Sequence, residues 1–169
     1  MFETDEQVEE LQQIIDRSFE RSGRYLQSIV EPEKRLSARQ VVRQLEGICI
    51  IAVATVSSRG EPRISSVDGH FLWGRFWFGT GGSALKARHL RRNAAISVSY
   101  FRGDEVAITV HGTATLFGRD SEEGEALRSH FTDVYGSDPY TWTDDDIAWV
   151  RVEPQSIITY APDAASFPE

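Results

Sequence analysis

Short β-type segments separated by tight turns fill residues 48–118, and this succession constrains the fold more than any other feature. The run ICIIAVATV at 48–56 is apolar and rich in β-branched residues, which is typical of a buried strand. Further strands are predicted at 62–72, 76–78, 95–101 and 106–117. Only one short helix, at 84–92, interrupts them. Consecutive strands with short turns favour an antiparallel barrel, closed or half-closed, over a doubly wound parallel sheet.

Helices are predicted on both sides of these strands. Apolar residues recur at three- and four-residue steps over 5–30, which indicates an amphipathic helix that packs either on the core or on a second subunit. Ser37 fits the N-cap of a second helix. Towards the end of the chain a helix and two strands are predicted, at 121–135, 147–152 and 157–160. The tail from Ala161 is expected to fray.

The length of 169 residues suits one domain that buries its own core. No repeat, low-complexity segment or interdomain linker interrupts the pattern. We therefore expect a single domain of the mainly β with α (α+β) class. Its helices would occupy 1–46, its barrel 47–160 and its tail 161–169.

Charge and cysteine content limit the partners and the compartment. The formal net charge of −8 argues against nucleic acid or an anionic membrane as the main partner. Cys49 is the single cysteine, so no intrachain disulfide can form, and its apolar surroundings predict a buried structural thiol. No signal-peptide pattern and no apolar run of about 20 residues is present. These features predict a cytoplasmic protein.

A glycine-rich turn at 79–82 joins a predicted strand to the helix at 84–92. Ser83 stands where a helix N-cap belongs, and Lys86 follows in the first turn. Glycines let a ligand approach the backbone, and early helical N–H groups attract anions. The turn therefore indicates a phosphate site, although neither a Walker loop nor a Rossmann fingerprint is present.

Arg63 begins the strand at 62–72 and is a second candidate anion ligand. A guanidinium on a strand needs an acidic partner or a bound anion, unless it simply lies exposed at an edge. The sequence leaves these alternatives open. Its planar fork of donors suits phosphate well.

The sequence contains no cluster of residues that is typical of acid–base or metal catalysis. The four histidines are scattered, and their spacing matches no zinc motif: His70, His89, His111 and His130. We expect His89 and His130 to face solvent and His111 to be structural. The acidic run at 144–146 is expected to be a solvated loop, and no metal site is predicted. A phosphate site without such machinery fits a cofactor that performs the difficult chemistry itself.

The order of these motifs resembles the flavin- and deazaflavin-binding split-barrel superfamily related to pyridoxamine 5′-phosphate oxidase. The resemblance rests on IIAVATVSSRGEPRISSV, RFWFGT, GGSALK, AISVSY and AITVHGTATLF, and covers about residues 36–118. It implies an antiparallel split barrel with flanking helices. It also implies a homodimer that holds FMN or coenzyme F420 in a cleft between subunits, and the sequence leaves the choice of cofactor open.

Family ligands are transferred here only onto matching residues. Arg63, Thr80 and Lys86 match the family's phosphate ligands, and Ser83 is a possible extra phosphate contact. By the same resemblance the ring system would lie along Ile64, Ser65, Ser66 and Val67.

Three positions depart from true pyridoxamine phosphate oxidases. Leu85 replaces the arginine before the turn lysine, Asp68 replaces a lysine near the end of the second strand, and Val106 replaces a glutamine. Vitamin B6 oxidation is therefore not expected, and a different redox substrate or cofactor is implied.

The sequence thus predicts an FMN- or F420-dependent oxidoreductase that passes hydride to a small organic acceptor. No catalytic side chain is assigned, and His70 and Tyr100 are the candidates if a proton donor is needed. The alternative is a non-catalytic carrier or sensor of a flavin, haem or related tetrapyrrole. A structural dimer whose cofactor site has decayed is a third hypothesis.

Overall fold

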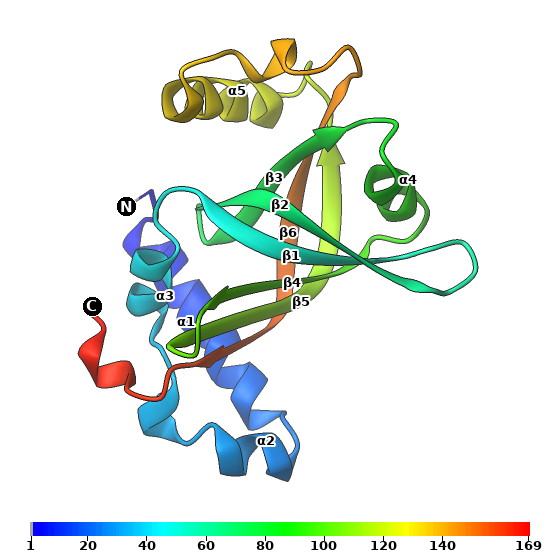
Figure 1. Ribbon diagram of the computed structural model, residues 1–169. Coiled ribbons are helices and arrows are strands. Elements are labelled where there is room, and N and C mark those ends of the chain that lie inside the picture. The colour runs from blue at the N-terminus through cyan, green and yellow to red at the C-terminus, as the bar shows by residue number, and fades with distance from the viewer. Residues whose placement is uncertain (1) are drawn as a thin grey trace.

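The computed structural model describes residues 2–169. Six antiparallel strands close into a barrel in the order β1-β2-β3-β6-β5-β4, which confirms the predicted fold class (Figure 1). The strands are β1 Cys49–Val56, β2 Pro62–Leu72, β3 Arg75–Gly81, β4 Ala95–Arg102, β5 Val106–Phe117 and β6 Ile147–Tyr160. The helices are α1 Asp5–Glu20, α2 Arg24–Ile29, α3 Ala38–Gln44, α4 Leu85–Arg92 and α5 Glu122–Tyr135.

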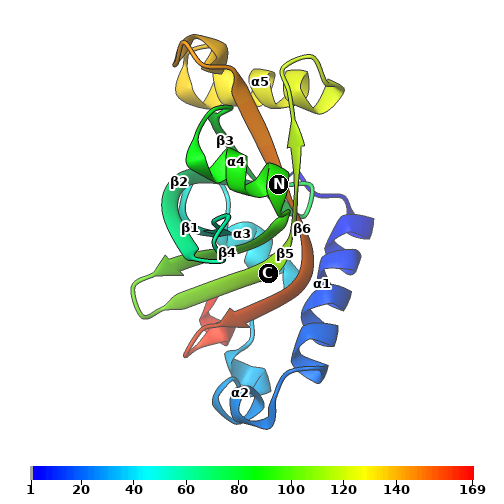
Figure 2. The ribbon, with the colours of Figure 1, turned by 90° about the vertical axis from the view of Figure 1, so that its right-hand side faces the viewer.

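The predicted single helix over 5–30 is wrong, because two helices occupy this segment. Between α1 and α2 the backbone of Gly23 is extended, with φ −68° and ψ 153°. Glycine costs about 1 kcal/mol in a helix interior relative to alanine, so it readily ends the run. The apolar face of α1 lies along β6 and is buried in this subunit's own core, with Leu11 only 1% exposed (Figure 2). The sequence left open whether this helix packs on the core or on a second subunit, and in the structure it packs on the core.

The end of the chain also differs from prediction. One continuous strand, β6, replaces the two predicted strands because a bulge at Gln155, next to Pro154 and opposite His111 and Gly112 of β5, lets the strand continue. The tail is held rather than frayed. Ala161 N–H donates to the Lys34 carbonyl, and Gln40 Nε2 donates to the carbonyls of Ala164 and Phe167.

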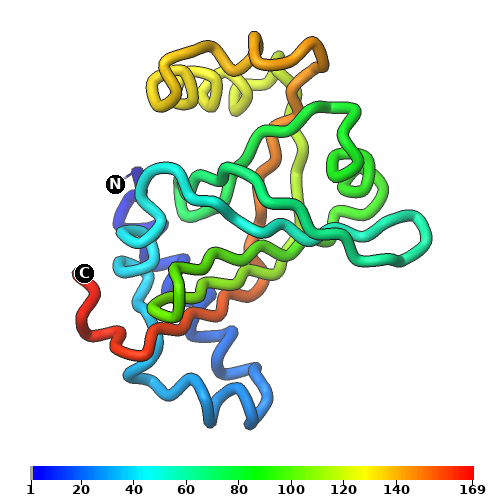
Figure 3. The backbone as a smooth tube through the Cα atoms, viewed as in Figure 1, coloured from blue at the N-terminus to red at the C-terminus, as the bar shows by residue number. Residues whose placement is uncertain are grey.

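The core fills the barrel with the inward-facing residues of every strand. Fully buried members include Ile51, Phe76, Phe78, Ile108 and Val150. Helix α5 lies across one end of the barrel (Figure 3). There its Leu127 and Phe131 pack against Trp77 and Trp149 in a second apolar cluster. Its C-terminus ends in Gly136 at φ 70°, a conformation that glycine adopts without strain.

The barrel wall is split between β2 and β3. The two strands pair only where His70–Leu72 meets Arg75–Trp77, while the rest of β2 pairs with β1 and the rest of β3 with β6. The hairpin of β1 and β2 extends away from the barrel, next to α4 (Figure 1). No helix within residues 2–169 is long and apolar enough to cross a membrane.

Candidate functional site

The split between β2 and β3 opens into a cavity of about 360 Å³. Its strand side consists of Ser66, Val67 and Asp68 from β2 and Gly79, Thr80 and Gly81 from β3. This volume lies within the usual range of small-molecule sites. The structure therefore brings Ser66, Val67 and Thr80, three of the predicted cofactor residues, to one cavity.

Aromatic side chains form another wall of this cavity. Phe131 and Tyr135 come from α5 and Trp142 from the segment that follows it, while Trp149 comes from β6, next to β3. The rings of Phe131 and Trp149 lie 4.7 Å apart, and those of Tyr135 and Trp142 lie 5.0 Å apart. A Cβ at Gly79 would lie only 3.0 Å from the Trp149 ring, so glycine lets the strand approach the indole closely. Such a wall suits a flat, aromatic ligand.

The glycine-rich turn borders the cavity and already binds an anionic oxygen. Ser83 donates from its N–H and its hydroxyl to Asp145 Oδ2, at 2.8 and 2.7 Å. Both bonds lower the pKa of Asp145, and the backbone bond has the larger effect. Ser83 is therefore not the N-cap predicted for α4, whose N-cap is Ala84. The prediction of a solvated acidic loop at 144–146 is also wrong for Asp145.

The two predicted phosphate cations lie beyond this cavity's lining, near the outer end of β1. Arg63 is exposed, pairs with Glu61 at 2.7 Å, and stands opposite Thr55 in the sheet. Thr55 Oγ1 lies 3.0 Å from His89 Nδ1 on α4. Lys86 precedes His89 by three residues, on the same helix face. The Lys86 side chain is half-buried, and it forms no ion pair with the residues that the structure describes.

The remaining predicted ring contacts divide between the two faces of β2. Ile64 is 74% exposed on the outer face, and Ser65 stands opposite the buried Val53 on the inner face. Neither lines the cavity at the split. The basic residues at the end of α4 donate hydrogen bonds to backbone carbonyls of neighbouring segments. Arg91 donates to the Gly82 carbonyl and Arg92 to the Val56 carbonyl.

The histidines have more partners than the sequence indicated. His130, predicted to face solvent, lies with its Nε2 3.1 Å from Nδ1 of His70. His89 is likewise half-buried against Thr55. His111 is exposed and pairs with Ser97 Oγ at 2.8 Å. No local sequence signal could have found the contact between His70 and His130, because 60 residues separate them.

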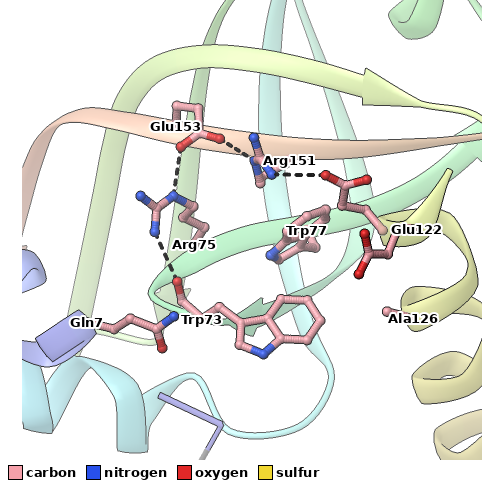
Figure 4. Close-up of a pocket in the computed structure, with 9 residues that line it drawn as sticks. Gln7, Trp73, Arg75, Trp77, Glu122, Ala126, Arg151 and Glu153 are labelled. Carbon is pink, nitrogen blue, oxygen red and sulfur yellow. Dashed lines mark hydrogen bonds and ion pairs between the residues drawn. The ribbon is translucent and has the colours of Figure 1, made fainter. Parts of the chain in front are cut away.

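A second cavity, of about 520 Å³, lies between β3, β6 and α5 (Figure 4). Trp73, Trp77, Arg75 and Arg151 line it. Glu153 lies between the two guanidinium groups and pairs with both, with Arg75 Nε at 2.7 Å. Both cations of this groove are therefore already paired with a carboxylate. It contains none of the residues that the sequence singled out.

The sequence model of the pyridoxamine 5′-phosphate oxidase family matches residues 37–161. The chain belongs to this family. The match confirms the resemblance seen in the strands and extends it through β6. Among the curated proteins, none matches the chain.

Solved structures of other proteins share the fold. A conserved hypothetical protein of Mycobacterium tuberculosis superposes with a TM-score of 0.65 at 19% identity, covering 82% of this chain and 93% of its own. An F420 reductase gives 0.54 at 19% identity, with 67% and 91% covered. HutZ, the haem storage protein of Vibrio cholerae, gives 0.59 at 17% identity, with 79% and 98% covered. At these identities the similarity establishes the fold alone.

Proposed function

We propose that this protein binds FMN or coenzyme F420 at the β2–β3 split and acts as an oxidoreductase on a small organic acceptor. The observation that carries the proposal is the cavity of about 360 Å³, which has an aromatic wall and borders a turn that binds an anionic oxygen. Membership of the pyridoxamine 5′-phosphate oxidase family and the likeness to an F420 reductase support it.

The residues present fit such a cofactor. The ring system would lie against Ser66, Val67 and Thr80, next to the aromatic wall. Ile64 and Ser65 lie on the same strand, towards the outer end of the hairpin. A bound flavin or deazaflavin supplies the hydride, while the protein orients the ring and excludes water from one side of it.

Phosphate binding would use the turn and the two cations near the outer end of β1. Lys86 and Arg63 supply charge, Thr80 supplies a hydroxyl, and Ser83 supplies the donors that now hold Asp145. A phosphate at Ser83 would displace that carboxylate. Lys86 and Arg63 would stabilise the phosphate on the cofactor's side chain if that group lies outside the cavity.

A second copy of the chain would complete the site. The outer face of β1, β2 and β4 exposes Ile50 at 62%, Ile64 at 74% and Phe101 at 60%. Ala52 and Ala54 lie between them on the same face. An exposed apolar patch of this kind typically marks a protein interface. We therefore propose a homodimer with the cofactor in the cleft between subunits.

Equilibrium titration with FMN and with F420, followed by absorbance and by tryptophan fluorescence, tests this function. Lys86→Ala and Arg63→Ala should each weaken binding by about 1.5–3 kcal/mol, the range for hydrogen bonds to charged groups. Arg24→Ala, on the exposed surface of α2, is the matched control. Wild-type titration curves for both variants would place the phosphate elsewhere. No binding of either cofactor would refute the function and leave a structural dimer.

The second candidate function is a carrier or sensor of haem or a related tetrapyrrole. The likeness to the haem storage protein favours it, and the cavity's aromatic wall suits a flat macrocycle as well as a flavin. Haem titration separates the two functions. Haem that binds more tightly than FMN and F420, without turnover of either reduced cofactor, would favour the carrier.

A further inference from the structure

A hydrogen-bonded chain of four side chains connects the cavity at the split with another cavity, which lies between β2, α5 and the end of α3. This outer cavity, of about 260 Å³, is lined by residues that include Glu3, Gly47, His70 and His130. Tyr135 and Asp68, at the other end of the chain, line the cavity at the split. His70 itself is only 1% exposed.

Every step of the chain is a hydrogen bond. His130 Nε2 lies 3.1 Å from His70 Nδ1, and His70 Nε2 lies 3.1 Å from the Tyr135 hydroxyl. That hydroxyl donates to Asp68 Oδ2 at 3.3 Å. The bonds join β2 to α5 and form a continuous path from one cavity to the other.

The direction of donation follows from the Asp68 carboxylate. An ionised carboxylate only accepts, so the Tyr135 proton points to Asp68 and the Tyr135 oxygen must accept from His70. His70 then carries its proton on Nε2 and accepts at Nδ1, which requires a proton on His130 Nε2. All donors therefore point the same way, from the outer cavity towards the split.

The surroundings keep the carriers neutral. Burial, with a smaller contribution from the nearby His130, lowers the pKa of His70 to about 4, although Asp68 opposes the shift. Burial also lowers the pKa of His130, against the charge of Asp133. Burial and the Asp68 carboxylate raise the pKa of Tyr135 to about 12. Glu3 and Glu46 are the other ionisable groups at the outer cavity.

We propose that His130, His70, Tyr135 and Asp68 form a relay that delivers a proton to the acceptor at the split, with Asp68 making the last transfer. This rests on the proposed function. The acceptor gains a hydride from the reduced cofactor and a proton from Asp68, which takes the proton of the Tyr135 hydroxyl. The Tyr135 oxygen takes the Nε2 proton of His70, His70 Nδ1 takes the Nε2 proton of His130, and water in the outer cavity supplies a proton to His130 Nδ1. A turn of each ring then restores the direction of donation.

Nitrogen-15 NMR of the histidine side chains tests the geometry without any cofactor. We expect His70 to be neutral, with its proton on Nε2, at every pH above about 5. His111→Gln, which removes an exposed histidine from β5, serves as the assignment control. A proton on Nδ1, or a charged His70 at neutral pH, would overturn the relay even in a protein that binds flavin.

Turnover tests the delivery, with reduced FMN or F420 and menadione as the probe acceptor. Tyr135→Phe keeps the ring and should lower the rate at least tenfold, abolish the solvent isotope effect and change cofactor affinity by less than about threefold. A wild-type rate and isotope effect in Tyr135→Phe would overturn the proposal. If neither cofactor binds, the proposed function is refuted, and the tautomer of His70 alone decides the relay.

Discussion

The buried His70 predicts how the stability of the fold depends on pH. Its pKa falls from an ordinary value of 6.5 to about 4 in the folded protein, chiefly because burial disfavours the imidazolium. Between these two values the unfolded chain binds a proton that the folded chain does not. The free energy of unfolding therefore falls as the pH drops from about 6.5 to about 4, and the contribution of His70 is constant below that range.

The size of the effect follows from the same two values. Between pH 7.5 and pH 5.0 the proton on unfolded His70 should cost the fold about 2 kcal/mol, and about 3.4 kcal/mol once the titration is complete. Carboxylates and His130 also titrate in this window, so the wild type alone does not isolate the effect. His70→Gln provides the background, because it removes the titrating ring and retains a donor for Tyr135.

Urea unfolding at pH 7.5 and at pH 5.0 measures the difference. We expect the wild type to lose about 2 kcal/mol more than His70→Gln between these conditions, whatever the variant's stability at pH 7.5. Equal losses in the two proteins would refute the reasoning. They would mean that His70 titrates normally and is accessible to water.

Three further predictions concern packing. Gly112→Ala should lower the free energy of unfolding by more than about 2 kcal/mol, because the added Cβ would lie 2.0 Å from the Glu153 carbonyl oxygen. Gly118→Ala, with no atom within 4 Å of its Cβ, should change it by less than about 0.5 kcal/mol in the same urea assay, and equal losses would contradict the clash. Leu127→Ala should cost about 2–5 kcal/mol, since Leu127 is fully buried on the inner side of α5, and a loss under 1 kcal/mol would show that α5 is loosely packed. Burial raises the pKa of Cys49 to about 11, so a thiol reagent at pH 8 should react roughly a hundredfold more slowly than in urea, and a rapid reaction would contradict that burial.

Periodicity and turn chemistry were enough to predict the strands and most of the helices. These signals are local, because each strand's alternation and each glycine turn can be read within about ten residues. Two of the errors arose where a distant residue decides. Pro154 reads as a strand breaker until its strand pairs with β5 through a register shift opposite His111 and Gly112. The tail reads as free until Gln40 binds its carbonyls.

The candidate site was likewise predicted only in part. Ser66, Val67 and Thr80 were assigned by resemblance, and the structure places them at one cavity. The aromatic wall and the contact of Tyr135 with Asp68 were not predicted, since they join β2 to a helix 67 residues later. The pairing of Ser83 with Asp145 was missed for the same reason, because only the folded chain brings the acidic loop to the turn.

Electron density from a crystal of the protein with bound FMN or F420 tests the central claim most directly. We predict density for a flat ring in the β2–β3 split, in contact with Ser66, Val67 and Thr80 and facing Trp149. Its phosphate should reach the turn at 79–83 and Lys86. Ring density in the groove between Trp73 and Trp77, with the split empty of ligand, would contradict the account.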